Sequence, residues 1–320
     1  RRMRIQVVDV GGNFIGPTLG LLTLGHDVEY FHNGPLRPVL AEAVAARTDT
    51  PDLAADLVVV AASFGDEMRT RAAGEFGDHP TDPDDPFLST LNPDQARIRA
   101  DWLTENLPHA SQSVLVDMAD DSHWIAPELC ELGDVRLKRE WRPTHLESNI
   151  EAFPFLYHAL VLEAEVLDEM DHFLRPPDAR ERLPCLRFAG AVEHARYAGR
   201  RRRWLEQLAS LEPNFRVEVV GPRLPAVQTW EALQHGYAGI YLEGTGSLCF
   251  RLHEYAALGV PTLAFGFDPS HLPAAWRGVL AGSTTTVKSP VEMLQFYRDH
   301  YMPIRAAEWL LEHATSASVR

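Results

Sequence analysis

The stretch that decides the fold runs from Tyr241 to Phe265 and reads YLEGTGSLCFRLHEYAALGVPTLAF. It predicts a strand, a glycine turn, a helix over about Leu248–Leu258, and a second, buried strand. Gly259 and Pro261 would end the helix, because glycine accepts the left-handed cap conformation and proline cannot continue a helix. This order of strand, helix and strand is typical of a parallel α/β sheet.

The glycine turn in this stretch indicates an anion site. Gly244 and Gly246 let the backbone approach a ligand closely, and the following helix would aim its free N–H groups and the positive end of its dipole at the turn. A diphosphate suits such a terminus. Glu254 lies about two turns inside the predicted helix. The alternative is an ordinary α/β unit in which Arg251 and Glu254 form an exposed pair worth about 0.2–0.5 kcal/mol.

The same stretch resembles the donor-binding half of GT-B-fold glycosyltransferases. The matching positions, close to the R-x-x-E-A-x-A-x-G-x-P pattern of group 1 and exostosin-like members, are Ser247, Arg251, Glu254, Ala257, Gly259, Val260 and Pro261. The resemblance implies that the glutamate binds the ribose of a nucleotide sugar and that the helix N-terminus faces its diphosphate. One position departs from the family: the retaining branch has a second glutamate where this chain has Gly246.

The resemblance implies an α/β fold of two Rossmann-like domains that face each other across a cleft. We expect residues 1–150 to form an N-terminal acceptor domain and residues 151–303 to form a C-terminal donor domain. A helix over residues 304–320 would pack back on the first domain. The length of 320 residues suits two such domains, and Glu140–Pro154 reads as the segment that links them.

Short runs of strand-forming residues predict the remaining strands. In the first half of the chain these runs are Met3–Val10, Asp27–His32, Leu57–Ala62, Ser113–Met118 and Val135–Lys138. A helix is expected over Pro17–Leu24. In the second half, a strand from Leu186 and another over Phe215–Val220 flank a helix that begins with four arginines. The capping box Ser289-Pro290-Val291-Glu292 predicts a long C-terminal helix with a kink at Pro303.

Polar residues follow several of these strands, where an open parallel sheet places its ligand. The candidates for the general base that activates an acceptor hydroxyl are Asp120, Asp121 and His123. The candidates for binding the nucleotide sugar are Gly11, Gly12, Asn13, Arg196, Gly246, Ser247, Arg251, Glu254 and Asp268. Some of the polar residues in these loops could instead have a structural role. Asp121 or Ser122 could cap the next helix, and Asp9 could be a structural carboxylate beside the first glycine loop.

Further arginines could hold the diphosphate, and no metal is expected. Arg187 and the run Arg200–Arg203 lie around the first strand and helix of the second domain. The alternative for the run is a solvated helix start. Asp82-Pro83-Asp84 matches the D-x-D metal signature of the other glycosyltransferase fold, but it lies in a proline-rich loop rather than at a strand end. We therefore expect no catalytic metal.

Composition limits the partners and the compartment. The chain has 45 acidic and 30 basic residues and a net charge of −15, which disfavours nucleic acid and anionic lipid. Only Lys138 and Lys288 are lysines, a bias that indicates a GC-rich, bacterial genome. The three cysteines lack C-x-x-C spacing, and the apolar run Ile5–Val10 is too short for a signal peptide or a membrane span. We expect a soluble cytoplasmic protein.

Taken with the resemblance, these observations predict a metal-independent glycosyltransferase of the hexosyltransferase type. It would move a sugar from a nucleoside-diphosphate donor to an unidentified acceptor hydroxyl on a small molecule, a glycan or a protein. No cofactor is expected besides the nucleotide sugar, which is a co-substrate. Two alternatives remain. One is a UDP-sugar 2-epimerase, which shares the architecture and needs no acceptor; the other is a non-catalytic GT-B scaffold that serves as a partner subunit.

Overall fold

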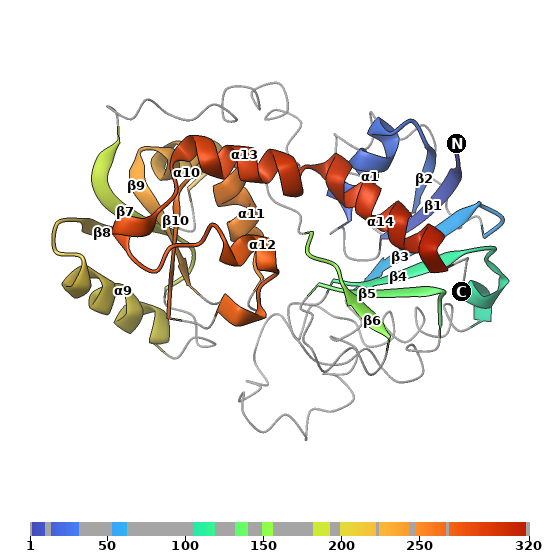
Figure 1. Cartoon of the computed structure of the whole chain (residues 1–320), viewed down its shortest axis with the longest axis horizontal. Helices are drawn as coiled ribbons and strands as arrows, with labels where there is room; N and C mark the ends of the chain where they lie inside the picture. Colours follow the sequence, from blue (N-terminus) through green and yellow to red (C-terminus); the bar gives the residue numbers. More distant parts are fainter. Residues whose placement is uncertain are drawn as a thin grey trace, which may run out of the picture. The chain divides into compact units, whose positions relative to one another are not determined.

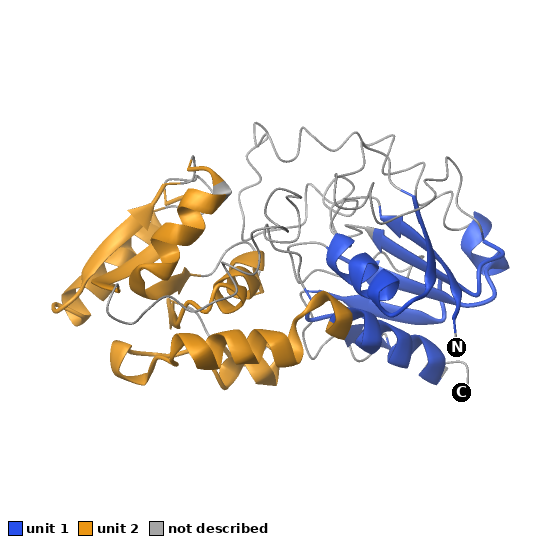
Figure 2. Cartoon of the chain, turned by 90° about the horizontal axis from the view of Figure 1, so that it is seen from above, with its two compact units in different colours: residues 1–36, 40–155, 306–320 blue, residues 37–39, 156–305 orange. Residues whose placement is uncertain are grey.

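The chain divides into two compact units, which Figure 2 distinguishes by colour. Unit 1 comprises residues 1–36, 40–155 and 306–320, and unit 2 comprises residues 37–39 and 156–305. The computed structural model describes residues 2–9, 14–31, 53–62, 105–118, 132–139, 149–155, 182–192, 199–221, 224–242, 248–266 and 269–317. Both units are α/β bodies built on a parallel sheet, as the sequence predicted at that level.

Unit 1 is built on a six-stranded parallel sheet in the order β2-β1-β3-β4-β5-β6 (Figure 1). The strands are β1 (Arg4–Asp9), β2 (Asp27–Phe31), β3 (Leu57–Ala62), β4 (Ser113–Asp117), β5 (Val135–Lys138) and β6 (Ile150–Ala152). The side chains of β1 and β4 are almost all buried, because helices and loops cover both faces of a parallel sheet.

Strand β6 lies in a segment that the sequence predicted to be a linker. It is only three residues long, and it pairs with β5 in a register that places Leu137 beside Glu151. Three residues are too few to show a strand periodicity, so the strand is defined by its pairing with β5 and not by its own pattern. The predicted linker is wrong for these residues.

Asp9 holds the start of helix α1 (Ile15–Thr23), which begins two residues before the predicted start. The Asp9 Oδ2 atom accepts a hydrogen bond from the Phe14 N–H at 2.8 Å and one from the Tyr30 hydroxyl at 2.6 Å. Pro17 is tolerated in the first turn, because the first N–H groups of a helix need no partner inside it. Asp9 therefore has the structural role considered as its alternative.

The C-terminal region forms two helices rather than one kinked helix. Helix α13 (Pro290–His300) begins with the predicted capping box, in which Ser289 and Glu292 bond each other's backbone N–H groups. Helix α14 (Pro303–Ala317) then begins at the proline. The predicted kink at Pro303 is wrong, because proline is favoured at the first position of a new helix, where its missing N–H has no cost.

Residues 306–317 of α14 pack within unit 1. The Trp309 ring lies 5.7 Å from the ring of Phe153 and 5.9 Å from that of Phe155. His313 Nε2 lies 3.3 Å from a carboxylate oxygen of Glu151 on β6. Gln112, the residue before β4 in the sequence, donates a hydrogen bond to the carbonyl of Ala314. These contacts attach the end of the chain to the sheet beside β6.

Unit 2 is built on a four-stranded parallel sheet in the order β10-β9-β7-β8. The strands are β7 (Leu183–Ala189), β8 (Arg216–Val220), β9 (Gly236–Leu242) and β10 (Thr262–Phe265). Its described helices are α9 (Arg200–Leu211), α10 (Ala226–Gln234), α11 (Phe250–Ala257) and α12 (Ala274–Arg277), together with α13. Three-residue 3-10 helices lie at Pro269–His271 and Thr284–Thr286 in unit 2 and at Leu107–His109 in unit 1.

The side chains of β7 alternate between the two faces of this sheet. Leu186 and Phe188 pack against Leu205 and Leu208 of α9 on one face. Arg187, between them, reaches the opposite face and donates a hydrogen bond to the carbonyl of Ala232 on α10. Helix α9 therefore covers one face, while α10 lies on the other. In the described part of the chain, no helix has both the length and the apolar character needed to cross a membrane.

The strand order of unit 2 reverses beside β7. The chain passes from β7 through α9 to β8, and then returns through α10 to place β9 on the other side of β7. In open α/β sheets, ligands bind outside the carboxyl ends of the strands at such a reversal. The topology therefore predicts a ligand site at the carboxyl ends of β7 and β9.

Candidate functional site

A pocket of about 490 Å³ lies at the carboxyl ends of β7, β8 and β9 in unit 2. Its lining combines apolar side chains with a few polar ones: Phe188, Ala189, Gly190, Ala191, Arg201, Val220, Gly221, Leu224, Thr229, Trp230, Ile240, Tyr241, Leu242, Cys249, Phe250, Arg251 and Glu254. Binding sites for small molecules have volumes of roughly 300–1,000 Å³ and this kind of lining. The pocket is therefore a candidate site by position, size and composition.

Glu254 is the buried carboxylate of this pocket. The residue is 1% exposed, and its Oε1 atom accepts a hydrogen bond from Trp230 Nε1 at 2.8 Å. Its Oε2 atom accepts one from Arg251 Nη1. Because each carboxylate oxygen can accept two hydrogen bonds, these two donors leave acceptor capacity on both oxygens. The alternative of an exposed Arg251–Glu254 pair is wrong: the pair is present, but the glutamate is buried.

Helix α11 begins later than the sequence predicted. Its first residue is Phe250, and Cys249 before it has extended backbone angles. The Cys249 N–H donates a hydrogen bond to the Tyr241 hydroxyl at 3.0 Å, which holds this residue outside the helix. Glu254 therefore lies just over one turn from the helix start, and not two turns. The end of the helix agrees with prediction, since Gly259 has a φ of +64° and its N–H bonds the Ala256 carbonyl.

Tyr255 joins the ends of the two strands beneath the pocket. Its hydroxyl donates to the Ile240 carbonyl at 3.1 Å and accepts the Ala189 N–H at 3.3 Å. Burial raises the pKa of the Tyr255 phenol, which keeps the hydroxyl protonated as a donor. Gly239 makes room for this ring, because a Cβ atom there would lie 2.8 Å from it. The ends of β7 and β9 are thus held by a side chain from α11.

Among the described residues that line the pocket, two arginines accompany one carboxylate. Arg201 is 8% exposed, and its Nη1 atom donates to the Ala191 carbonyl at 2.8 Å. Its guanidinium lies over the Phe188 ring, 5.4 Å from the centroid. Burial lowers the pKa of the Arg251 guanidinium, but Glu254, Tyr255 and Cys249 together raise this pKa by more, so the net shift is upward. Such a pocket favours an anionic ligand.

The other described arginines have different surroundings. Arg187 does not line the pocket; it donates from Nε to Glu218 Oε2 at 3.0 Å, which gives it a structural role in the sheet. Arg200 lies over the Trp204 ring, 5.5 Å from the centroid. Arg202 borders a second pocket between α9 and β8. Of the run Arg200–Arg203, Arg201 is the residue that lines the candidate site.

Most of the residues predicted for the site lie outside the described residues and stay predictions. They are Gly11, Gly12, Asn13, Asp120, Asp121, His123, Arg196, Gly246, Ser247 and Asp268, together with the metal-like motif Asp82–Asp84. Arg251 and Glu254 are described, and both line the pocket. Within the described ranges, no three His, Cys, Asp or Glu side chains are grouped closely enough to hold a metal ion.

Sequence reasoning missed two residues at the site, Trp230 and Tyr255, and did not single out Arg201 from its run. Trp230 bonds a glutamate 24 positions away, and Tyr255 bonds Ala189 at a separation of 66. No local pattern in the sequence reports contacts of this length. Arg201 could have been singled out from its run, because it lies four residues before the apolar Leu205 and thus on the buried side of α9.

Asp117, the last residue of β4, forms a buried ion pair in unit 1. Its Oδ2 atom lies 2.5 Å from Lys138 Nζ, and both side chains are 0% exposed. The two residues end β4 and β5 and face each other in the sheet register. Asp117 is therefore occupied by an internal partner.

Comparison with known proteins gives a distant likeness only. No protein-family model matches the chain, and no curated protein matches it significantly. Among solved structures, the chain is similar to that described as the crystal structure of CalG4, the calicheamicin glycosyltransferase. The two are 12% identical with a TM-score of 0.40, and the match covers 99% of each chain. At this level the likeness assigns no function to the chain.

Proposed function

We propose that the chain is a GT-B glycosyltransferase that moves a hexose from a nucleoside-diphosphate sugar to an acceptor hydroxyl without a metal ion. In this proposal unit 2 is the donor domain, and unit 1 is the acceptor domain, across a cleft. The observation that carries the proposal is the buried carboxylate of Glu254, oriented by Trp230 and Arg251 in a pocket at the carboxyl edge of the sheet.

The polar groups of the pocket suit the parts of such a donor. The remaining acceptor capacity of Glu254 would take hydrogen bonds from the two ribose hydroxyls. The guanidinium groups of Arg201 and Arg251 would neutralise the diphosphate as it leaves, which is where negative charge develops in glycosyl transfer. Because Glu254 already has two protein donors, its orientation is set before the nucleotide arrives.

A non-catalytic GT-B scaffold is the second candidate. The same two donors to Glu254 are what a purely structural carboxylate would have, and Gly246 stands where the retaining branch has a glutamate. No observation on this chain favours the epimerase over these two candidates.

The test is incubation of the purified chain with UDP-, GDP- and TDP-linked sugars and a CMP-linked control. We expect release of the nucleoside diphosphate by transfer or slow hydrolysis with at least one donor. Formation of an epimer would replace the proposal by the epimerase. A folded chain that neither binds nor turns over any donor would favour the scaffold.

We expect turnover to be independent of divalent cations. The positive charge that faces the diphosphate would come from Arg201 and Arg251, so that no metal ion is needed to neutralise it. Nucleotide release should be the same before and after EDTA treatment, and Arg201→Met should lower it in both conditions. Loss of activity in EDTA with recovery in Mn²⁺ would contradict this and would point to Asp82 and Asp84 instead.

A further inference from the structure

Strand β8 forms one edge of the unit 2 sheet, and no described strand pairs with its outer side. Among the described strands, β8 pairs with β7 alone. Val219 is 48% exposed, and the Arg216 side chain is 71% exposed. An edge strand presents backbone N–H and C=O groups that pair readily with another strand. This edge is therefore a surface that a further strand could extend.

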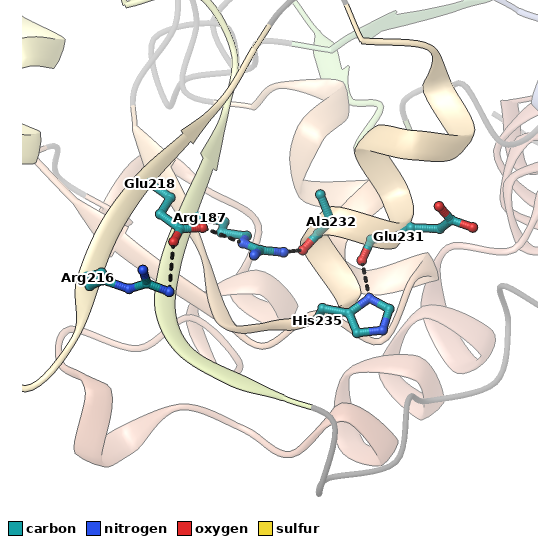
Figure 3. Close-up of polar contacts among 6 residues, drawn as sticks. All are labelled: Arg187, Arg216, Glu218, Glu231, Ala232 and His235. Carbon is teal, nitrogen blue, oxygen red and sulfur yellow. Dashed lines mark hydrogen bonds and ion pairs between the residues drawn. The ribbon is translucent and has the colours of Figure 1, made fainter.

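A row of charged groups crosses the sheet to this edge, as Figure 3 shows. Arg187 on β7 bonds Glu218 on β8 through Nε at 3.0 Å, and it also donates to the Ala232 carbonyl. The Oε1 atom of Glu218 lies 3.3 Å from Arg216 Nη2. In Figure 3, Glu218 lies between the two arginines, and Arg216 lies on the side away from Ala232 and His235. The row thus ends with a cation and an anion two positions apart on the edge strand.

We propose that β8 pairs with β8 of a second copy of the chain, antiparallel and about a two-fold axis through Val217. In this register Arg216 of each copy lies opposite Glu218 of the other, on one face of the joined sheet. The segment Arg216-Val217-Glu218 is therefore complementary to itself, and it would form two cross-strand pairs of opposite charge. The two sheets would become one continuous sheet.

The alternation of side chains restricts the possible registers. Residues directly opposite each other in an antiparallel pair project to the same face of the sheet. A two-fold axis normal to the sheet therefore has to lie midway between one residue and the same residue of the other copy; we name the axis by that residue. An axis through Arg216 would place two arginines opposite each other, and an axis through Glu218 would do the same for two glutamates. Like charges opposite each other destabilise a pair of strands. The charge pattern thus favours the axis through Val217.

The other face of β8 would contribute apolar contacts. Val217 and Val219 border a groove of about 450 Å³ between α9 and β8, together with Leu205 and Ala209 of the helix. In the proposed register Val217 lies opposite its own copy, and Val219 lies opposite Phe215 of the other chain. Pairing would therefore cover exposed apolar side chains on both copies, which supports a second copy as the occupant of this edge. This inference does not depend on the proposed function.

Sedimentation of the full chain tests the proposal. We expect the parent chain to pass from monomer to dimer as its concentration rises. Arg216→Glu replaces both attractive pairs by Glu–Glu pairs, so the dissociation constant of the dimer should rise about 30-fold. Arg277→Glu makes the same change of charge at an exposed position of α12 and should leave the dissociation constant unchanged. A parent chain that stays monomeric, or a dimer insensitive to Arg216→Glu, would overturn the proposal.

Mixing two variants tests the register itself. Glu218→Arg should also dissociate the dimer, but a mixture of this variant with Arg216→Glu should form a heterodimer, because every glutamate then faces an arginine. Failure of the two folded variants to pair would overturn the register. If Glu218→Arg does not fold after losing its bond to Arg187, a mixture of Arg216→Glu with the parent chain replaces this test. That mixture should dimerise with an intermediate dissociation constant, because one of its two pairs stays attractive; a constant equal to the parent's would count against the register.

Discussion

Glu254→Gln is expected to weaken the binding of a nucleoside diphosphate about 10- to 150-fold, because a hydrogen bond to a charged group contributes about 1.5–3 kcal/mol. Glutamine keeps the size of the side chain and one acceptor oxygen, which can still accept from Trp230. It removes the charge and places an amide donor where the carboxylate accepted. Calorimetry with UDP, GDP and TDP measures the change without knowledge of the sugar or the acceptor.

The surroundings of Glu254 require more than one variant. Glu254→Ala should show the same loss of affinity, and it should also lower the free energy of unfolding by about 1–3 kcal/mol, because the buried Trp230 N–H loses its acceptor. Glu206→Ala, at an exposed position of α9, serves as the control and should change neither quantity. If the glutamine and alanine variants both fold and bind every nucleotide as tightly as the parent chain, the donor-site assignment fails.

Trp230→Phe separates orientation of the carboxylate from its charge. The substitution keeps an aromatic ring at a fully buried position but deletes the donor to Glu254. We expect a smaller loss of affinity than for Glu254→Gln, since the carboxylate stays but Arg251 alone orients it. Combination of Trp230→Phe with Glu254→Gln should then cost less than the sum of the two single changes. Strict additivity would mean that Trp230 does not act through the glutamate.

The sequence predicted those parts of the fold that have a local cause. The buried strand Leu57–Ala62 is a continuous apolar run, and Val135–Lys138 alternates apolar and basic residues; the predicted bounds of both agree with the structure. The start of α13 was predicted because Ser289 and Glu292 bond each other within one turn. In contrast, β6 exists through its pairing with β5, and α11 starts where Tyr241 holds Cys249. Those causes come from other parts of the chain, so the local pattern did not reveal them.

The same distinction applies to the candidate site. Arg251 and Glu254 belong to one short motif and were predicted together. Their surroundings could not be predicted in this way, because Trp230 reaches Glu254 from a different helix and Arg201 reaches the pocket from the opposite face of the sheet. The burial of Glu254 also has a tertiary cause, and burial is what changes an exposed pair into an oriented carboxylate.

Lys138→Met is expected to destabilise unit 1 by about 3–5 kcal/mol, because it leaves the buried carboxylate of Asp117 without its cation. The loss of the pair as a whole should cost much less than the loss of one member. We therefore expect the double variant Asp117→Asn/Lys138→Met to regain much of the stability lost in Lys138→Met. Urea denaturation of the parent chain, of Lys138→Met, of Asp117→Asn and of the double variant completes a double-mutant cycle.

Two further substitutions identify what this position requires. Lys138→Arg keeps the charge, but a wide planar guanidinium has to fit where a compact ammonium group lies 2.5 Å from a carboxylate oxygen, at a site with no exposed surface. We expect it to be destabilising as well, although the chain uses arginine for nearly all its other cations. Lys288→Met changes the only other lysine, whose side chain is 39% exposed and whose ammonium lies 3.8 Å from Glu292. An exposed pair of this kind is worth about 0–1 kcal/mol, so this control should change the unfolding free energy little. If Lys138→Met lowers the free energy of unfolding no more than Lys288→Met does, the Asp117 carboxylate does not depend on the lysine. The pair would then have no structural role.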